Sequence, residues 1–482
     1  MSDIVLFFPK TGYDIKNSSV ELPLSMLSLA SVLVDDYDVK IIDQRVDEDW
    51  EKKLEHELST EPLAVTMSAM TGTQITNAIA ISKRVKEAGS KTVWGGIHAT
   101  ILPYQTIQHP AIDYVIVGDG EFTLKSLLGT LSNGGDITKI QNMISKDKEV
   151  STLSVKMPIA EPESIPELPF YLINVENYIK SGGMTFSKKE RILPFISSRG
   201  CPYRCAYCST GFLSERRWKP LSAEETVNRI LNMKKMFNID VVKFYDENFL
   251  SNPRRAETIA DGIGGKLKWS IQARMDNLLL VDLARMENGG LRVVEPGVES
   301  GSNRILSLIN KDETKETMLK ANRKLSETNI KSFYNFMMGF PTETHEELIE
   351  TIDFALQLIG ENNNAHITGF YVYSPYPGST LYNLALQYGF KPPENLEGWA
   401  EYSRQHHHTP WIQDKIDMFD AIMYGAKFVD GKRMKYILRN TKVPPFVLSM
   451  LGHYFRNKWK KHDFRETYVL KALKYAANKA LN

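Results

Sequence analysis

The stretch Ser197-Ser198-Arg199-Gly200-Cys201-Pro202-Tyr203-Arg204-Cys205-Ala206-Tyr207-Cys208 contains every cysteine of the 482-residue chain, in the spacing Cys-x3-Cys-x2-Cys. Three thiolates in one loop can hold a metal centre, but they cannot all pair as disulfides. Because the sequence has no fourth cysteine, the centre must keep one open position. Zinc bound by three cysteines fits this description, and so does a 4Fe–4S cluster with one free iron. Structural zinc sites usually take ligands from two separated hairpins, so the cluster is favoured.

The aromatic residue directly before the last cysteine, Tyr207, completes a motif that resembles the signature of the radical S-adenosylmethionine (SAM) enzymes. The resemblance implies that Cys201, Cys205 and Cys208 bind a 4Fe–4S cluster whose free iron holds the amino and carboxylate groups of SAM. In that family an electron from flavodoxin or ferredoxin reaches the cluster, which cleaves SAM to a 5′-deoxyadenosyl radical. Zinc remains the alternative that the residues alone leave open.

Residues 1–135 alternate short apolar runs with helical patterns. This alternation predicts a doubly wound, Rossmann-like parallel sheet, in which ligands bind beyond the carboxyl ends of the strands. The Gly-x-Gly-x-x-Gly fingerprint of dinucleotide sites is absent after the first strand. The expected strands are residues 4–8, 39–43, 63–67, 92–95 and 114–118.

Three segments of this region are similar to the cobalamin-binding domain that precedes the radical SAM domain in one large subgroup: residues 22–30 (LPLSMLSLA), 94–98 (WGGIH) and 113–121 (DYVIVGDGE). The chain is therefore identified as a member of the cobalamin-dependent radical SAM enzymes, of the class B methyltransferase type. The resemblance implies cobalamin contacts at the strand ends, from Pro9, Thr11, Ser68, Met70, Thr71, Gly95, Gly96, His98, Gly118, Gly120 and Glu121.

The Asp-x-His-x-x-Gly motif, with which many cobalamin enzymes supply a histidine to cobalt, does not occur. We therefore expect cobalamin to bind with its own base displaced and without a histidine ligand. In the subgroup, His98 would belong to the cofactor pocket; a loop histidine without any ligand role is the alternative.

Residues 136–188 are rich in proline and predict an extended linker. Residues 189–388 resume the alternation and predict a partial (βα)6 barrel of the TIM type, with the cysteine loop after its first strand. Residues 389–482 predict a mainly helical, basic domain. The expected barrel strands lie near residues 193–197, 240–245, 268–272, 292–298, 332–338 and 366–373.

Polar and aromatic residues follow the predicted barrel strands, where active sites of such barrels lie. The resemblance implies SAM contacts from Tyr207, Asp246, Glu247, Gln272, Arg274, Glu299, Ser300, Phe340 and Tyr373. Tyr371 and Tyr373 would share one strand face and are candidate catalytic residues, although aromatic pairs in strands are more often core. Glu343 also follows a strand, and a charge favoured by a helix start is its simpler explanation.

The composition is that of a soluble globular protein, with 42% hydrophobic and 24% charged residues. No apolar run reaches the ~20 residues that span a bilayer, and residues 4–8 lack the flanks of a signal peptide. Thiolates that bind a cluster need a reducing compartment, so we expect a cytoplasmic protein without a transmembrane segment.

The net charge of +1 is unevenly distributed, because residues 427–479 hold 14 lysines and arginines and three acidic residues. Solvated helix faces are the ordinary explanation; a docking surface for an acidic protein or a membrane surface is the sharper one. Nucleic acid is disfavoured, since no RNA-binding module accompanies these charges. The triplet His406-His407-His408 follows Trp399 and Tyr402, but consecutive histidines on a helix cannot all face one metal.

The resemblance implies a C-methyltransferase in which the deoxyadenosyl radical removes hydrogen from an sp3 carbon and methylcobalamin donates the methyl group. The basic, aromatic C-terminal region favours a peptidyl side chain as substrate, for example in methyl-coenzyme M reductase. The alternatives are an anaerobic ring cyclase of the magnesium-protoporphyrin monomethyl ester type, a radical SAM enzyme that does not use cobalamin, and a zinc-binding protein without enzymatic activity.

Overall fold

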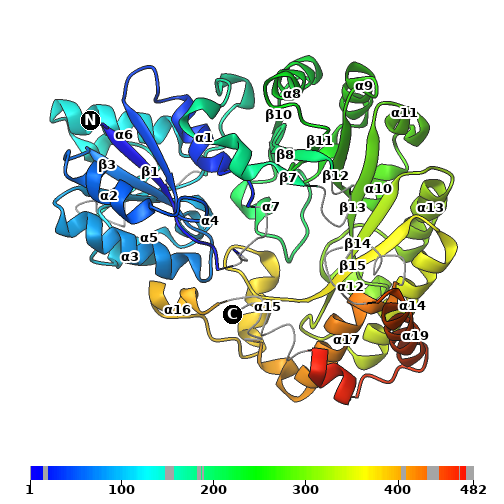
Figure 1. Cartoon of the computed structure of the whole chain (residues 1–482). Coiled ribbons are helices and arrows are strands. Elements are labelled where there is room, and N and C mark those ends of the chain that lie inside the picture. The colour runs from blue at the N-terminus through cyan, green and yellow to red at the C-terminus, as the bar shows by residue number, and fades with distance from the viewer. Residues whose placement is uncertain are drawn as a thin grey trace. The chain divides into compact units, whose positions relative to one another are not determined.

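The computed structural model describes residues 2–12, 14, 20–146, 157–181, 186, 189–402, 409–430, 444–465 and 467–473. The chain folds into two compact units (Figure 1). The first unit comprises Met1–Ile179, Ser209–Pro220 and Lys391–His406, and the second comprises Lys180–Cys208, Leu221–Phe390 and His407–Asn482. Within the described ranges, every helix is too short or too polar to cross a membrane.

The first unit contains a six-stranded sheet in the order β2-β1-β3-β4-β5-β6. The first five strands are parallel, and β1 lies between β2 and β3, so the chain reverses its direction of travel across the sheet there. This is the switch point at which doubly wound sheets bind ligands. The strands are β1 (Ile4–Phe8), β2 (Val39–Asp43), β3 (Ala64–Ser68), β4 (Lys91–Gly95), β5 (Tyr114–Ile116) and β6 (Met143–Ser145).

Strand β6 lies within the predicted linker region, and it pairs antiparallel with β5 at the edge of the sheet. Three residues are too few for a period-two pattern to distinguish them from an extended loop, so sequence reasoning missed this strand. The same region contributes Tyr178, whose buried hydroxyl donates a hydrogen bond to Asp43 at the end of β2 over 2.9 Å. Part of the region therefore packs on the sheet.

Helices cover both faces of this sheet (Figure 1). Helix α1 packs against α6, and the short α16, from much later in the chain, packs against α3. The helices are α1 (Leu24–Ser31), α2 (Trp50–Leu58), α3 (Gln74–Glu87), α4 (Gly96–Ile101), α5 (Pro103–Gln108), α6 (Glu121–Asn133) and α16 (Leu396–Ala400).

The second unit contains a seven-stranded sheet in the order β15-β14-β13-β12-β11-β8-β7. Six of these strands are parallel and follow one another in chain order, as the predicted partial barrel requires, and the two-residue β7 (Lys180–Ser181) pairs antiparallel with β8. The parallel strands are β8 (Arg191–Phe195), β11 (Val241–Phe244), β12 (Lys268–Arg274), β13 (Leu291–Glu299), β14 (Lys331–Met338) and β15 (Ala365–Val372).

The helices between these strands begin at residues suited to cap them. In α8 (Ala223–Phe237) the hydroxyl of Ser222 accepts the backbone N–H of Glu225. In α14 (His345–Glu361) Thr344 and Glu347 form a reciprocal capping box. The remaining crossover helices are α9 (Pro253–Ile263), α11 (Leu283–Asn288), α12 (Asn303–Leu308) and α13 (Lys315–Ser326).

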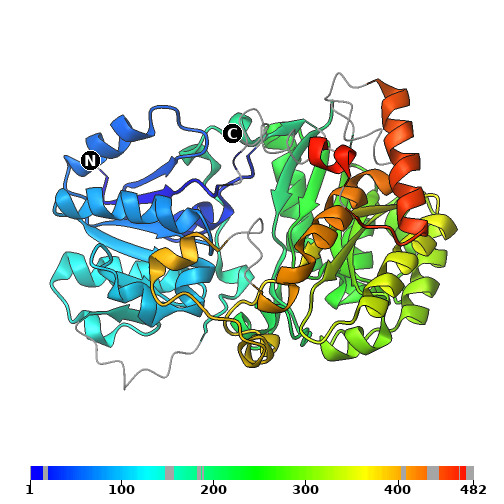
Figure 2. The ribbon, with the colours of Figure 1, turned by 90° about the horizontal axis from the view of Figure 1, so that it is seen from below.

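The C-terminal part is helical, as predicted. Helix α17 (Ile416–Val429) packs on β15, and α19 (Pro445–Lys460) packs on α17; Figure 2 shows these two helices next to each other. Trp459, within the basic segment of α19, is 1% exposed and packs edge-on against Phe370 of β15. The basic helix is thus anchored by an apolar face.

Candidate active site

The cysteine loop follows β8 and the short β9 (Ser198–Gly200), at the carboxyl end of the barrel strands. Cys201, Cys205 and Cys208 form no disulfide bonds, and their side chains are half-buried. The backbone of Ala206, between two of them, donates to the carbonyl of Ile309 over 2.7 Å and accepts from the N–H of Leu381 over 2.8 Å. The loop is therefore held from two directions by residues distant in the sequence.

Burial raises the pKa of the Cys201 thiol to about 11, and the neighbouring thiols and the exposed carboxylate of Glu247 add to this effect. Burial also raises the pKa of the Cys205 thiol, but the ammonium of Lys311 and the guanidinium of Arg274 oppose the rise. The two cations beside Cys205 favour its thiolate form, but burial outweighs them and the pKa stays raised.

Asp246, a predicted SAM contact, is fully buried after β11 and accepts three short hydrogen bonds. They come from the backbone N–H and hydroxyl of Ser197, both over 2.7 Å, and from the hydroxyl of Ser198 over 2.5 Å. The buried guanidinium of Arg255 donates to the carbonyl of Ser197 over 3.0 Å. Asp246 therefore fixes the start of the cysteine loop, and its carboxylate oxygens are engaged within the protein.

Arg274 ends β12 with its guanidinium beside the cysteine loop. One nitrogen lies 3.6 Å from Sγ of Cys205, and the guanidinium carbon lies 4.1 Å from the ring centre of Tyr203. The carboxylate of Asp276 accepts two bonds from the same group, over 3.1 and 3.0 Å. Gln272, on the same strand, is half-buried.

Glu299 ends β13 in a left-handed backbone conformation with φ of 65°, after a register shift at Gly297. Its carboxylate accepts the hydroxyl of Tyr207 over 2.8 Å and the ammonium of Lys311 over 3.2 Å. Burial raises the pKa of Tyr207 well above its usual value. A Cβ atom on Gly297 would lie 2.1 Å from the Glu299 carboxylate. The carboxylate can therefore occupy this position only because residue 297 is glycine. Lys311 carried no signal in the motifs, and sequence reasoning missed it.

Two further predicted contacts lie on this side of the barrel. The ring centre of Phe340, after β14, lies 6.5 Å from that of Tyr207 and 5.5 Å from that of Tyr373. The hydroxyl of Ser300 lies 3.0 Å from that of Thr351 in α14. The structure thus gathers Tyr207, Phe340 and Tyr373 into one aromatic cluster.

Tyr371 and Tyr373 do not share an environment, although the period-two pattern predicts one face for both. Tyr371 is 39% exposed, whereas Tyr373 is 1% exposed and stacks near Phe340. Strand β15 ends at Val372, so the alternation that holds within a strand does not extend to Tyr373.

Glu343 is a loop residue, because α14 begins two residues later and takes its cap from Thr344. One carboxylate oxygen accepts the N–H of Gly339 over 2.5 Å, and no hydrogen-bond partner among the described residues reaches the other. Burial raises the pKa of Glu343 to about 7. The carbonyl of Gly339 in turn accepts the indole N–H of Trp411 over 2.9 Å, which closes this loop from the C-terminal side.

In the first unit, two glycines at the strand ends allow neighbouring segments of the chain to pack closely against the backbone. A Cβ atom on Gly96, whose φ is 89°, would lie 2.5 Å from the hydroxyl of Ser68; one on Gly118, at φ 78°, would lie 2.5 Å from the ring of Pro158. Gly95 and Gly120 leave more space, with nearest atoms at 3.9 and 3.3 Å. These loops also expose apolar side chains at Met70 (42%) and Ile97 (48%).

His98 is buried behind these loops, with Nδ1 3.0 Å from the hydroxyl of Thr71. Burial lowers the pKa of His98 to about 4, so its imidazole is neutral near pH 7. Its ring centre lies 6.0 Å from that of Trp399, which comes from the segment after the barrel. The carbonyl of Trp399 accepts the N–H of Gly72 over 3.1 Å. The sequence analysis assigned Trp399 to the helical region that follows the barrel in sequence and missed its packing in the first unit.

The remaining predicted contacts in this unit take part in bonds that order the strand ends. The carbonyl of Pro9 accepts the side-chain amide of Gln74 over 3.0 Å. The hydroxyl of Thr11 donates to Asp14 over 2.9 Å. Glu121, buried at the start of α6, accepts the hydroxyl of Ser28 over 2.6 Å.

The donor chemistry of these sites fits the cofactors that the sequence motifs imply. Across the described ranges, no three His, Cys, Asp or Glu side chains already converge as a metal-ion site. Three cysteines on one loop, none in a disulfide and with two cations beside Cys205, match a cluster that needs three protein ligands and keeps one iron open. Exposed apolar side chains at the strand ends of the first unit are suited to pack against the flat face of a large macrocycle. The triplet at 406–408 lies outside the described residues.

Comparison with known proteins identifies a family model for each of two parts of the chain. Residues 195–355 match the family model of the radical SAM superfamily, and residues 15–128 match that of the B12 binding domain. An uncharacterized methyltransferase of Pyrococcus horikoshii is 29% identical, over 80% of this chain and 83% of that protein. An anaerobic magnesium-protoporphyrin IX monomethyl ester cyclase of Cereibacter sphaeroides is 26% identical, over 79% of this chain and 59% of that protein.

Two solved structures share the fold. The cobalamin-dependent SAM radical enzyme OxsB, with aqua-cobalamin and SAM bound, gives a TM-score of 0.69 at 19% identity, over 96% of this chain and 71% of that one. The radical SAM methyltransferase TsrM of Kitasatospora setae, with cobalamin and a 4Fe–4S cluster bound, gives 0.67 at 16% identity, over 99% of this chain and 100% of that one. The predicted fold class is confirmed.

Proposed function

The chain belongs to the cobalamin-dependent radical SAM enzymes of the methyltransferase type, and from this premise we propose that it transfers a methyl group to an sp3 carbon of its substrate. The family uses a 4Fe–4S cluster, SAM and cobalamin. When bound, these groups supply radical removal of hydrogen and a transferable methyl group. The protein supplies ligands, orientation and exclusion of water.

We assign the cluster to Cys201, Cys205 and Cys208. The observation that carries this assignment is the loop with three half-buried cysteines, none in a disulfide, at the carboxyl end of β8. Asp246 acts as a positioning residue here, because its hydrogen bonds hold residues 197 and 198 just before the loop. Ala206 is fixed by backbone bonds on both sides, which limits how far the thiols can separate.

We assign SAM to the strand ends around this loop. The carboxylate of Glu247 is exposed after β11, and we place the SAM ammonium against it. Glu299 holds the hydroxyl of Tyr207, which fixes the aromatic ring beside the last cysteine. The other proposed SAM contacts are Gln272, Arg274, Ser300, Phe340 and Tyr373.

We assign cobalamin to the strand ends of the first unit, with Met70 offering the largest exposed apolar contact among the predicted residues. His98 supports the pocket, since its hydrogen bond to Thr71 orders the loop after β3. The other proposed contacts are Pro9, Thr11, Ser68, Gly95, Gly96, Gly118, Gly120 and Glu121.

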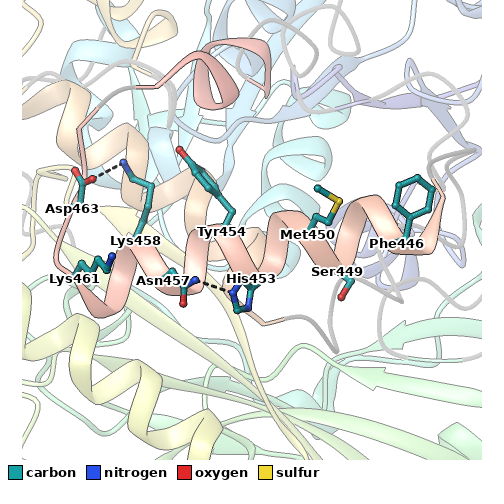
Figure 3. Close-up of a pocket in the computed structure, with 9 residues that line it drawn as sticks. All are labelled: Phe446, Ser449, Met450, His453, Tyr454, Asn457, Lys458, Lys461 and Asp463. Atoms are coloured by element: carbon teal, nitrogen blue, oxygen red, sulfur yellow. Dashed lines mark hydrogen bonds and ion pairs between the residues drawn. The ribbon is translucent and has the colours of Figure 1, made fainter.

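We propose a peptidyl side chain as the substrate and an acidic flavodoxin or ferredoxin as the electron donor. Helix α19 supports the first proposal: its residues line a groove of about 770 Å³. Phe446 (65%) and Met450 (66%) are exposed toward the start of the helix, and Lys461 lies at the opposite end of the groove (Figure 3). A groove with aromatic and thioether groups at one end and cations at the other suits an apolar peptide segment that also carries acidic residues. Figure 3 shows Lys458 turned to its ion pair with Asp463, at 3.3 Å, so Lys458 is less available to a partner.

An anaerobic assay tests the methyltransferase proposal directly. The reconstituted protein is incubated with SAM carrying a deuterated methyl group and with cell extract, and mass spectrometry locates the label. We expect one labelled methyl group on a carbon of a peptide, and label on a small molecule alone would contradict the peptidyl substrate. Charge reversal at Lys460 and Lys461 should then slow turnover of an intact protein substrate but not of a short peptide. If the variant turns over both substrates at the wild-type rate, docking at α19 is contradicted.

The similarity to the ring cyclase favours a second candidate, cyclisation of a magnesium-porphyrin ester. The same assay separates the two, because cyclisation adds no labelled methyl group to the product.

A further inference from the structure

Residues 309–313, between α12 and α13, contact the cysteine loop on both sides of Cys205. The carbonyl of Ile309 accepts the N–H of Ala206 over 2.7 Å. The carboxylate of Asp312 accepts two bonds, each of 3.0 Å, from the guanidinium of Arg204. Ala206 and Arg204 are the two residues that flank Cys205. Residues 309–313 therefore fix the cysteine loop through the two residues that flank Cys205.

The same segment also holds Arg274, a cation close to the thiol. The carbonyl of Lys311 accepts a 2.5 Å hydrogen bond from Arg274, whose guanidinium lies 3.6 Å from Sγ of Cys205. The buried carboxylate of Glu313 accepts the N–H of Asp276 over 2.6 Å and lies 3.6 Å from the same guanidinium. Arg274 is thus oriented by both ends of residues 311–313.

The ammonium of Lys311 is buried at the centre of this arrangement, with a side-chain exposure of 4%. It lies 3.2 Å from the carboxylate of Glu299 and 3.6 Å from that of Glu313. The carboxylate of Glu299 also accepts a hydrogen bond from the hydroxyl of Tyr207, two residues beyond Cys205. A charge this far from water acts on its neighbours through a low dielectric, so it is felt more strongly than a surface lysine.

The backbone around Lys311 is unusual for a stretch without glycine. Asn310 and Asp312 both adopt left-handed conformations, with φ of 49° and 56°, and Glu299 does so opposite them. Such conformations persist when surrounding contacts determine them, and they concentrate at functional sites. The segment is therefore built to place one side chain, that of Lys311, against the interior of the site.

We propose that residues 309–313 position the cluster at Cys205, and that Lys311 is a positioning residue whose buried charge raises the reduction potential of the bound cluster. The proposal rests on the assignment of Cys205 as a cluster ligand. A reduced cluster carries one more negative charge than an oxidised one, so a nearby cation stabilises the reduced form and a nearby anion destabilises it. Lys311 and Glu299 should consequently act in opposite directions.

The test is an EPR-monitored redox titration of the anaerobically reconstituted full-length protein without SAM, so that SAM binding by Glu299 does not enter. We expect Lys311→Met to lower the midpoint potential. Glu299→Gln should raise it, because the amide still accepts the Tyr207 hydroxyl while the Lys311 charge loses a counterion. Lys311→Arg should stay close to wild type. Lys320→Met, at an exposed lysine of α13, is the matched control and should leave the potential unchanged.

Unchanged potentials in variants that fold and carry iron, or shifts of the opposite sign, would overturn the proposal. Should Lys311→Met fail to fold, the sign of the shift in Glu299→Gln decides alone. Iron and sulfide content of the wild-type protein is measured first. Wild-type protein without iron would instead contradict the assignment of the three cysteines, so the two failures are distinguishable.

Discussion

The cations of Arg274 and Lys311 both act on the thiol of Cys205. Replacing Cys205 with alanine leaves two thiols, which are too few to hold a 4Fe–4S cluster. We expect loss of iron and of the brown colour after anaerobic reconstitution. Corrinoid binding, measured by absorbance after gel filtration, should persist, because the B12-binding region is a separate part of the chain. Iron at the wild-type ratio in this variant would contradict the assignment.

Glu343 gives the site a predicted dependence on pH. Its carboxyl has a pKa of about 7 when folded and about 4.5 when unfolded, because burial disfavours the charge. Between these values the unfolded chain has released the proton and the folded one has kept it, so stability falls as pH rises through this window. The loss amounts to about 3 kcal/mol and is complete above about pH 7.

Urea unfolding of Glu343→Gln against wild type at about pH 5 and about pH 8 measures this effect. The amide cannot ionise, so the variant should be more stable than wild type at the higher pH and close to it at the lower. A wild-type stability that does not fall across the window more than that of the variant would contradict a protonated Glu343.

Individual residues show where sequence reasoning reaches its limit. The cysteine spacing and Tyr207 carried enough pattern to predict a cluster loop. Lys311 carried none, because a buried lysine and an exposed one look alike in sequence, and burial depends on the fold. Asp246 was assigned to SAM from its place after a strand, but only the structure reveals Ser197 and Ser198 as its partners.

Strand β13 ends in a bulge that is needed for the position of Glu299. A methyl group at Gly297 would meet the Glu299 carboxylate at 2.1 Å and the Lys311 ammonium at 3.2 Å. Gly297→Ala should therefore displace this ion pair and weaken SAM binding several-fold, measured by equilibrium dialysis with the reconstituted protein. Gly360→Ala in α14 is the control: nothing lies within 4 Å, so it should bind SAM normally and gain up to ~1 kcal/mol in stability. Equal SAM affinity in both variants would contradict the role of the bulge.

Whole elements were more predictable than their ends. The buried strands of both sheets follow continuous apolar runs, and β11 lies within the predicted range 240–245. Helix α14 begins two residues after the predicted start, because Thr344 provides a better cap than Glu343. Strand β6 was missed, since three residues paired at a sheet edge carry too short a pattern. Which strands pair depends on the tertiary fold, and a local sequence pattern carries no information about that pairing.

On the scale of the whole molecule, the units do not follow the order of the chain. Lys391–His406 follows the barrel in sequence but belongs to the first unit, where α16 packs on α3. Trp399 is 1% exposed there and lies against His98, while its carbonyl holds Gly72 after β3. The loops that we assign to cobalamin are thus supported by residues from beyond the barrel.

Trp399→Ala tests this long-range support. Removing a buried indole costs about 3 to 5 kcal/mol in the first unit and leaves His98 without its cover. We expect the variant to lose most of its corrinoid while keeping iron in the cysteine loop, both measured on one anaerobically reconstituted sample. Cys205→Ala predicts the reverse pattern, so each variant is the control for the other. Loss of iron together with corrinoid in Trp399→Ala would contradict a role confined to the first unit, where Trp399 contacts His98 and Gly72.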